Sequence, residues 1–383
     1  MLFSNIRRIF NKALGQPAYA IRVGIRRLIA NAHYIFGGGR SSPPESVTLF
    51  LTHRCNLRCS MCGQWGEGGV TKKRSLEFIK EELSFDVLRS AVDGMSSYSP
   101  AVTLFGGEPL LYKDCIALIR HIKSKRMHCL IITNGFLIEE YARRLIDSGL
   151  DELNVSLDGS RDLHDRIRGV PGLFEKILSG LETVRDLKRS AGKRNPLVNI
   201  QCTITKSNYH RLEEMTAVAS RAEANSLTFH NLIFTNKEIL EKQKKFDDIL
   251  GASSDDWRGF EFDPGIDPQV LREKMDRILS GRYDFSVDFY PYLSRTSLEN
   301  YYNDTDYAPS KHNTRCLSPW IAAYVFPNGE VRPCLNSTYS YGNIKDAPLC
   351  RIWNSQKALR HRQLLRENKI FPACARCTEL YRY

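Results

Sequence analysis

The chain has 383 residues, of which 42% are apolar and 26% are charged, as is usual for soluble globular proteins. This length suffices for one large domain with a smaller one, or for two medium-sized domains. No stretch approaches the roughly 18 continuous apolar residues of a membrane span, and the first residues lack the apolar core of a secretory signal. Eleven cysteines, with three at 55–62 and five between 316 and 377, point to metal or redox chemistry rather than to a disulfide framework.

The formal net charge is +12, and the positive charge is unevenly placed. Residues 1–40 contain apolar residues between basic ones and no acidic residue. Three interpretations are open: an amphipathic helix on an anionic membrane surface, a surface for an anionic substrate or carrier, or terminal helices packed on the main domain with their arginines in water. The basic residues are Arg7, Arg8, Lys12, Arg22, Arg26, Arg27 and Arg40.

A Gly- and Pro-rich linker at 37–44 is followed by strand-like apolar runs that alternate with helical patterns. We expect strands at 46–52, 101–106, 127–133, 151–157, 197–204 and 226–232, and helices at 76–94, 113–125, 137–148, 173–190 and 210–223. Six βα units imply a parallel sheet, because each return to a parallel strand needs a crossover. Six units fit an open partial barrel better than a closed barrel of eight.

The strand sequences also predict which side chains face the inside of this barrel. Polar residues share one face of the later strands, and such a face is costly on an internal strand unless it lines a ligand site. Cys202 falls on the opposite, apolar face, and Cys115 and Cys129 are expected to be buried in the same way. The residues expected to face the lumen are Ser156, Asp158, Asn199, Gln201 and Thr203.

The first strand is followed by a C-x3-C-x2-C loop, CNLRCSMC, which we call the N-terminal triplet (Cys55, Cys59 and Cys62). Three thiolates on one tight loop can hold three irons of a [4Fe–4S] cluster and leave the fourth iron without a protein ligand. Such an open coordination position is where a substrate or cofactor binds. Zinc sites also use close cysteine spacing, so the loop alone does not decide the metal.

Polar or glycine-rich residues end three further strands, at the edge where ligands bind in parallel sheets. Two glycines in Gly106-Gly107-Glu108-Pro109 let the backbone approach a ligand closely. A carbonyl or carboxylate there can accept hydrogens from an ammonium group. The other strand ends are Thr133-Asn134-Gly135 and Val155-Ser156-Leu157-Asp158-Gly159.

Residues 236–315 are harder to interpret. Helical patterns at 235–250 and 268–280 flank a loop at 251–266, and an aromatic-rich stretch follows from 283 to 307. This stretch is either a lid over a substrate or an irregular connector.

The C-terminal part holds a second group of cysteines, which we call the C-terminal cysteine set (Cys316, Cys334, Cys374 and Cys377). An Asn328-Gly329 turn between strand-like runs predicts a hairpin before Cys334. Four thiolates can saturate one auxiliary [4Fe–4S] cluster or hold one zinc ion. Cys350 is left without a role.

Taken in this order, CNLRCSMC, GGEP and VSLDG resemble the radical SAM (S-adenosylmethionine) superfamily, and the C-terminal set with its GNI and IWN motifs resembles the SPASM/Twitch extension of that family. The resemblance implies a (β/α)6 partial barrel at 45–235 and an auxiliary-cluster domain at 316–383, with 1–44 and 236–315 as further segments. It implies a SAM cluster on the N-terminal triplet, one auxiliary [4Fe–4S] cluster, SAM, and an electron donor of the flavodoxin or ferredoxin type. The implied SAM contacts are Met61, Gly106, Gly107, Glu108, Thr133, Asn134, Ser156, Asp158 and Arg168.

The reaction implied by this resemblance is reductive cleavage of SAM to a 5′-deoxyadenosyl radical, which abstracts hydrogen from a substrate. A sugar, an aminocyclitol or a lipid-linked small molecule is expected, because residues 1–40 are too short for a peptide-recognition domain. Modification of a peptide is the alternative. A non-catalytic metal protein that binds nucleic acid is the remote alternative, and no nucleic-acid motif is visible. We expect the protein in the cytoplasm or at the periphery of a membrane.

Overall fold

The computed structural model describes residues 17–309 and 314–383. A single ten-stranded sheet forms its centre, in the order β10-β9-β8-β1-β2-β3-β4-β5-β6-β7. The pairs from β8–β1 through β6–β7 are parallel, and the β8–β9 and β9–β10 pairs are antiparallel. The strands are β1 (Ser46–Phe50), β2 (Ala101–Phe105), β3 (Cys129–Thr133), β4 (Glu152–Ser156), β5 (Leu197–Thr203), β6 (Ser226–His230), β7 (Ser286–Tyr290), β8 (Ala322–Val325), β9 (Glu330–Arg332) and β10 (Gly342–Asn343).

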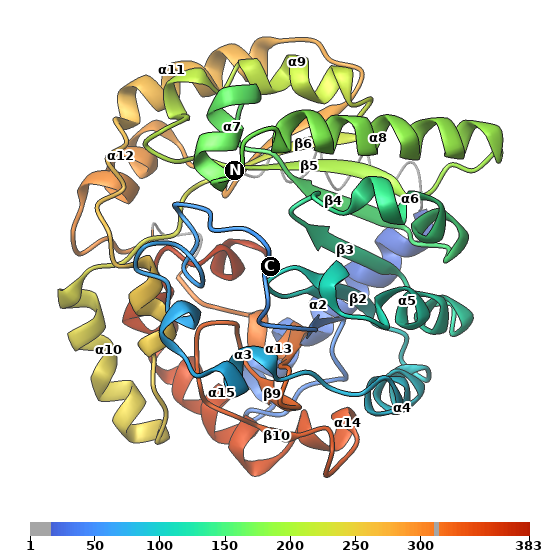
Figure 1. Cartoon of the computed structure of the whole chain (residues 1–383). Helices are drawn as coiled ribbons and strands as arrows, with labels where there is room; N and C mark the ends of the chain where they lie inside the picture. The colour runs from blue at the N-terminus through green and yellow to red at the C-terminus, as the bar shows by residue number, and fades with distance from the viewer. Residues whose placement is uncertain (1–16, 310–313) are drawn as a thin grey trace.

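Helices cover the outer side of the curved sheet, and the end of the chain is drawn inside the ring of elements (Figure 1). Serine, asparagine and aspartate side chains cap the N-termini of several of them, for example Ser84 before α4 and Asn236 before α10. The helices are α2 (Pro17–Phe36), α3 (Leu76–Lys80), α4 (Phe85–Met95), α5 (Cys115–Ser124), α6 (Ile138–Asp147), α7 (Arg161–Arg168), α8 (Leu173–Ser190), α9 (Glu214–Arg221), α10 (Lys237–Leu250), α11 (Pro268–Ser280), α12 (Arg295–Asn303), α13 (Ser318–Ile321), α14 (Leu349–Ile352) and α15 (Gln356–Asn368). Short 3-10 turns are η1 (Thr71–Lys73), η2 (Pro109–Leu111), η3 (Tyr209–Arg211), η4 (Asp255–Phe260), η5 (Pro372–Cys374) and η6 (Thr378–Tyr381).

The expected α/β fold with a partial (β/α)6 barrel is confirmed, since β1–β6 occupy the six predicted strand positions in sequential parallel order. The single helix expected at 76–94 is wrong. It is two helices, because the chain becomes extended at Glu81 and a new helix begins behind the Ser84 cap. The helix expected at 210–223 is also shorter, because its first turn is the 3-10 turn η3.

The sheet extends past both edges of the six predicted strands. The aromatic-rich stretch contributes β7, which pairs with β6, and the C-terminal part contributes β8, which pairs with β1. These additions give hydrogen-bond partners to both edges of the six-stranded unit, which would otherwise be exposed. The predicted hairpin is confirmed: β8 and β9 are antiparallel, and Gly329 in the turn has φ +93°.

The N-terminal basic segment falls partly outside the described residues, because description begins at Pro17. From there one helix, α2, runs to Phe36. Within the described residues, no helix is long and apolar enough to cross a membrane.

Candidate functional site

The N-terminal triplet lies on an irregular loop directly after β1, where the three thiols gather. Cys59 is buried, and Cys55 and Cys62 are half-buried. Burial raises the pKa of Cys55 to about 11, and the thiols of Cys59 and Cys62 are near enough to raise it further. The thiolate form that binds metal must therefore be stabilised by the metal itself and by nearby hydrogen-bond donors.

Each sulfur of the triplet has such a donor. The backbone N–H of Leu57 lies 3.4 Å from Cys55 Sγ, and that of Trp65 lies 3.4 Å from Cys62 Sγ. Arg168 Nη1 lies 3.6 Å from Cys59 Sγ. Three free thiols with a donor apiece fit an iron–sulfur cluster, whose reduction potential such hydrogen bonds tune.

Gly106 and Gly107 allow the GGEP segment to pass against the root of the cysteine loop. Gly106 has φ +151°, and a Cβ on Gly107 would stand 2.2 Å from the carbonyl oxygen of Arg54. Backbone hydrogen bonds join Gly107 N to the Thr52 oxygen and Glu108 N to the Arg54 oxygen, both at 2.8 Å. Any larger residue at 107 would push the two segments apart.

The side chain of Glu108 lies between β2 and the end of β3. Its side chain is fully buried, and its oxygens accept from Thr133 Oγ1 (2.8 Å), Asn134 N (2.8 Å) and Leu110 N (3.1 Å). Burial outweighs these donors and raises the pKa of Glu108 to about 7. The carboxylate therefore joins β2 to the end of β3 and is not open to an ammonium group.

Asp158 and Arg168, both predicted SAM contacts, form a buried ion pair with each other. Arg168 Nε lies 2.6 Å from Asp158 Oδ2, and Nη2 lies 2.5 Å from the same oxygen. Asp158 Oδ1 accepts from Thr203 N at 2.8 Å. Because Arg168 also contacts Cys59, this pair links the ends of β4 and β5 to the cysteine loop.

The remaining predicted contacts lie around the same strand ends. Thr133 is buried and holds Glu108, so its hydroxyl serves the packing of the strand ends. Asn134 Nδ2 donates to Asn56 Oδ1 at 2.8 Å and lies 3.8 Å from Cys55 Sγ. Ser156 is half-exposed at the end of β4, and Met61 is half-buried between two cysteines of the triplet.

The predicted division of the strands into a polar and an apolar face is confirmed. Along β4, β5 and β6 half-exposed residues alternate with fully buried ones. Ser156, Asn199, Gln201 and Thr203 are on the half-exposed face, whereas Asp158 beyond the strand is buried. Cys202, Cys115 and Cys129 are fully buried, as expected.

The four thiols of the C-terminal cysteine set come together from separate segments. Burial raises the pKa of Cys377 well above its usual value, and Cys374, Cys334 and Cys316 are near enough to add to the effect. Cys350 is exposed on α14. Among residues 17–309 and 314–383, no three His, Cys, Asp or Glu side chains are close enough to hold a single metal ion. Zinc would draw all four sulfurs to about 2.3 Å from one point, whereas a [4Fe–4S] cluster binds each sulfur to a separate iron.

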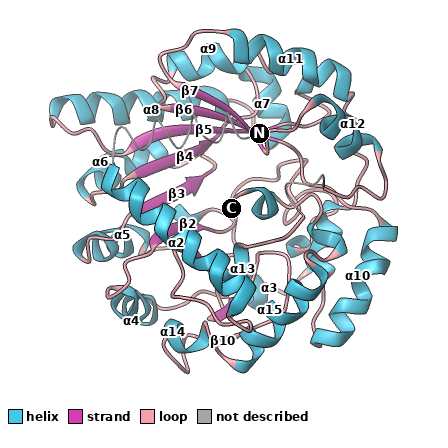
Figure 2. Cartoon of the chain, turned by 180° about the vertical axis from the view of Figure 1, so that it is seen from behind, coloured by secondary structure: helices cyan, strands magenta, loops and turns pink. Residues whose placement is uncertain are grey.

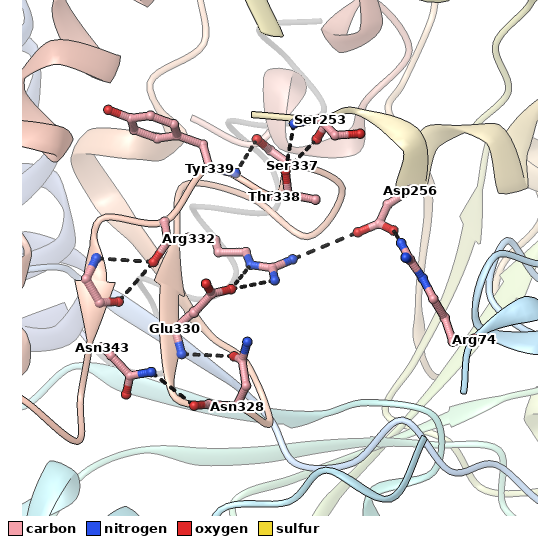
Figure 3. Close-up of polar contacts among 12 residues, drawn as sticks. Arg74, Ser253, Asp256, Asn328, Glu330, Arg332, Ser337, Thr338, Tyr339 and Asn343 are labelled. Atoms are coloured by element: carbon pink, nitrogen blue, oxygen red, sulfur yellow. Dashed lines mark hydrogen bonds and ion pairs between the residues drawn. The ribbon is translucent and has the colours of Figure 1, made fainter. Parts of the chain in front are cut away.

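An ion-pair network links the segment that follows the N-terminal triplet to the hairpin that precedes Cys334 (Figure 3). Asp256 of η4 lies between Arg74, on the loop after the N-terminal triplet, and Arg332 of β9, two residues before Cys334. The nearest N–O distances are 3.5 Å to Arg74 and 3.9 Å to Arg332, and Glu330 holds Arg332 at 2.5 Å. Arg332 and Asp256 are mostly buried, with side chains 12% and 20% exposed, whereas Arg74 is 44% exposed.

Aromatic contacts run beside this network. The Arg332 guanidinium lies 4.1 Å from the centre of the Phe326 ring, and Phe326 stacks on Phe50 at 5.4 Å. Phe50 in turn lies 5.0 Å from His53, two residues before the triplet. Tyr290 Oη on β7 also donates to the Thr378 oxygen, next to Cys377, at 2.7 Å. Both cysteine sites are thus anchored to the same barrel.

Comparison with known proteins agrees with this arrangement. The family model of the radical SAM superfamily matches residues 49–217, and the model of the SPASM iron–sulfur cluster-binding domain matches residues 316–378. The chain belongs to the radical SAM superfamily. It is a radical SAM enzyme with a C-terminal SPASM domain, and its cofactors are SAM and [4Fe–4S] clusters in both domains.

Among curated proteins, the AdoMet-dependent heme synthase of Nitratidesulfovibrio vulgaris is 24% identical over 369 residues, covering 90% of this chain and 89% of that protein. The Fe-coproporphyrin III synthase of Methanosarcina barkeri is 31% identical over 224 residues, covering 58% of this chain and 52% of that protein. Among solved structures, Streptococcus suis SuiB bound to S-adenosylmethionine has a TM-score of 0.62 at 14% identity, covering 95% of this chain and 78% of that chain. The anSMEcpe structure with bound AdoMet has a TM-score of 0.54 at 17% identity, covering 89% and 96%. At these identities the structural likeness shows the fold.

Proposed function

We propose that this enzyme abstracts hydrogen from a small molecule held at the mouth of the barrel, between a SAM cluster on the N-terminal triplet and an auxiliary cluster on the C-terminal cysteine set. Bound to the first cluster, SAM supplies a 5′-deoxyadenosyl radical when one electron arrives. The observation that carries the proposal is the gathering of two groups of free thiols at one barrel, with a hydrogen-bond donor at each sulfur of the first group.

The residues around the first site divide into holding and contacting groups. We assign the side chains of Glu108, Asp158, Arg168 and Thr133 to holding the strand ends and the cysteine loop, because they bond one another, Glu108 with Thr133 and Asp158 with Arg168. Met61, Asn134, Ser156 and the Gly106–Gly107 backbone remain as proposed SAM contacts. Dehydrogenation or epimerisation is the proposed outcome, with the auxiliary cluster taking or relaying one electron.

For the substrate we propose a hydroxylated small molecule: a sugar, an aminocyclitol or a lipid-linked glycan. Amide and hydroxyl side chains on the half-exposed faces of β4–β6 suit hydrogen bonds to hydroxyl groups. A tetrapyrrole is the second candidate, because relatives named heme synthases match this chain over nearly their whole length. A peptide remains the alternative, and the likeness to the peptide-bound SuiB structure supports only a shared fold.

As partners we propose a flavodoxin or ferredoxin as the one-electron donor, and an anionic membrane surface for the N-terminal segment of an otherwise cytoplasmic enzyme. No nucleic-acid partner is proposed.

The test begins with anaerobic reconstitution, followed by iron, sulfide and zinc analysis. About eight irons per chain are expected, and addition of dithionite and SAM should give 5′-deoxyadenosine. Four irons with one zinc would overturn the auxiliary cluster and leave the core. The loaded enzyme is then incubated with sugars, aminocyclitols, porphyrins and peptides in deuterated buffer. A product with two hydrogens fewer than the substrate indicates dehydrogenation. A product with the substrate's formula in which one hydrogen is replaced by deuterium indicates epimerisation. A product from peptides alone would overturn the small-molecule proposal.

A further inference from the structure

Helix α2 has one face against the body of the protein. Ala30 and Tyr34, four residues apart, are 5% and 7% exposed. The Tyr34 ring meets Trp320 of α13 edge to face at 4.9 Å. In the view from behind, α2 runs across the front of the molecule toward α13 (Figure 2).

The opposite face of α2 carries large apolar side chains that nothing in the described chain covers. Their spacings of three, four and seven residues place them in one stripe. Of the eight large apolar side chains recorded as exposed among the described residues, five lie in this stripe, so the exposure is concentrated and not scattered. We call it the α2 stripe: Ile25 (53% exposed), Leu28 (72%), Ile29 (39%), Ile35 (50%) and Phe36 (84%).

The charge around the stripe is positive. The sequence of α2 contains Arg22, Arg26 and Arg27 and no acidic residue, and Arg27 lies 4.0 Å from a Glu45 oxygen. Three arginines along the flanks of α2 bond neutral acceptors: Arg26 the Tyr98 oxygen, Arg315 the Asn31 Oδ1, and Arg366 the Ile35 oxygen, at 2.6, 2.7 and 3.2 Å. Within the part of the chain that the structure describes, none of these three pairs with a carboxylate, so their charge is not neutralised.

We propose that the α2 stripe docks the enzyme on an anionic lipid bilayer, with the helix in the interface plane and its basic flanks on the headgroups. An apolar stripe bordered by arginines and free of acidic residues is what such a surface binds. A second copy of the chain fits less well, because a symmetric dimer through this stripe would bring the two basic rims together. The inference rests on the membrane contact in the proposed function and names its residues, but it does not depend on the reaction.

The test is co-sedimentation of the reconstituted full-length enzyme with phosphatidylcholine vesicles, with and without phosphatidylglycerol. We expect binding to the anionic vesicles only, weakened by salt. The variant Leu28→Ser/Phe36→Ser removes two side chains from the stripe and should lower the partition coefficient about tenfold or more per residue. The matched control is Leu76→Ser on α3, where an equally apolar side chain is 66% exposed away from the stripe, and it should bind as the wild type does.

Three results would overturn the proposal: no binding of the wild type to anionic vesicles, equal binding of the double variant, or equal loss in Leu76→Ser. Analytical ultracentrifugation without lipid tests whether a second copy of the chain binds the α2 stripe. A dimer that the double variant dissociates would assign the stripe to a second copy instead. Formation of 5′-deoxyadenosine in lipid-free buffer should be unchanged in all variants. Its absence from the wild type would refute the proposed reaction while the vesicle result still stands.

Discussion

The Asp158–Arg168 ion pair offers the sharpest test of the site. The Asp158 side chain is 0% exposed and that of Arg168 is 10% exposed, so neither charge has water as an alternative partner. Replacing Asp158 with Asn keeps the shape and leaves the buried guanidinium without its counter-charge. Breaking a buried pair on one side typically costs about 3–5 kcal/mol. The amide oxygen of Asn can still accept from Thr203 N, so the cost reports mainly the lost ion pair.

The assay is urea unfolding of the reconstituted protein under anaerobic conditions, followed by circular dichroism. An exposed pair is the control: Arg189→Gln removes one of the two arginine partners of Glu223, with side chains 64% and 45% exposed, and should cost less than about 1 kcal/mol. The double variant Asp158→Asn/Arg168→Met should recover part of the loss, because it removes the stranded charge. A cost for Asp158→Asn no larger than that of the control would refute the view that this pair holds the cysteine loop.

Three further predictions concern the clusters and one buried acid. Cys59→Ala should abolish 5′-deoxyadenosine formation and leave about four irons per chain; retained SAM cleavage would contradict the assignment of the N-terminal triplet. Cys374→Ala/Cys377→Ala should remove about four irons, and unchanged iron would point to other ligands, whereas Cys350→Ala should leave iron content as it was. Glu108, whose pKa burial raises to about 7 in the folded state, holds its proton more tightly than the unfolded chain does. Its contribution to stability is therefore present at acidic pH and falls by about 3 kcal/mol as pH rises from about 4.5 to 7. The difference in free energy of unfolding between wild type and Glu108→Gln, measured by urea titration from pH 5 to 8, should shift by that amount, and a constant difference would count against a buried acid.

The strand pattern was predictable because each core strand is short, apolar on one face and separated from the next by a helical pattern. The cysteine loop and the GGEP turn were found from local spacing. Strand β7 and the pairing of the predicted hairpin strand β8 with β1 were not found. β7 has a half-exposed, mixed sequence, SVDFY, and β8 pairs with β1 across more than 250 residues of sequence, a partnership that no local pattern encodes.

The site residues show the same limit. Residue type and position at a strand end located Glu108, Asp158 and Arg168 at the right edge of the sheet, but could not tell which groups bind one another. Arg168 donates to Asp158, ten residues away in sequence, and lies close to Cys59. Glu108 accepts from the Thr133 hydroxyl and the Asn134 backbone at the end of β3. Spacing brings such groups near one another. Only packing decides whether a carboxylate faces a ligand or an arginine.

This distinction bears on how the enzyme works. An open iron position is useful only if the loop that holds the cluster keeps a fixed distance from the substrate, since misplacement of reacting atoms by about 1 Å can cost a hundredfold in rate. The N-terminal triplet has no helix or strand of its own to fix it. Instead, Arg168 at the end of α7 and Asn134 just after β3 reach its sulfurs, while Asp256 and Phe326 connect its neighbours to the hairpin before Cys334. Polar residues at the ends of the strands and of α7 thus tie the cysteine loop to the barrel.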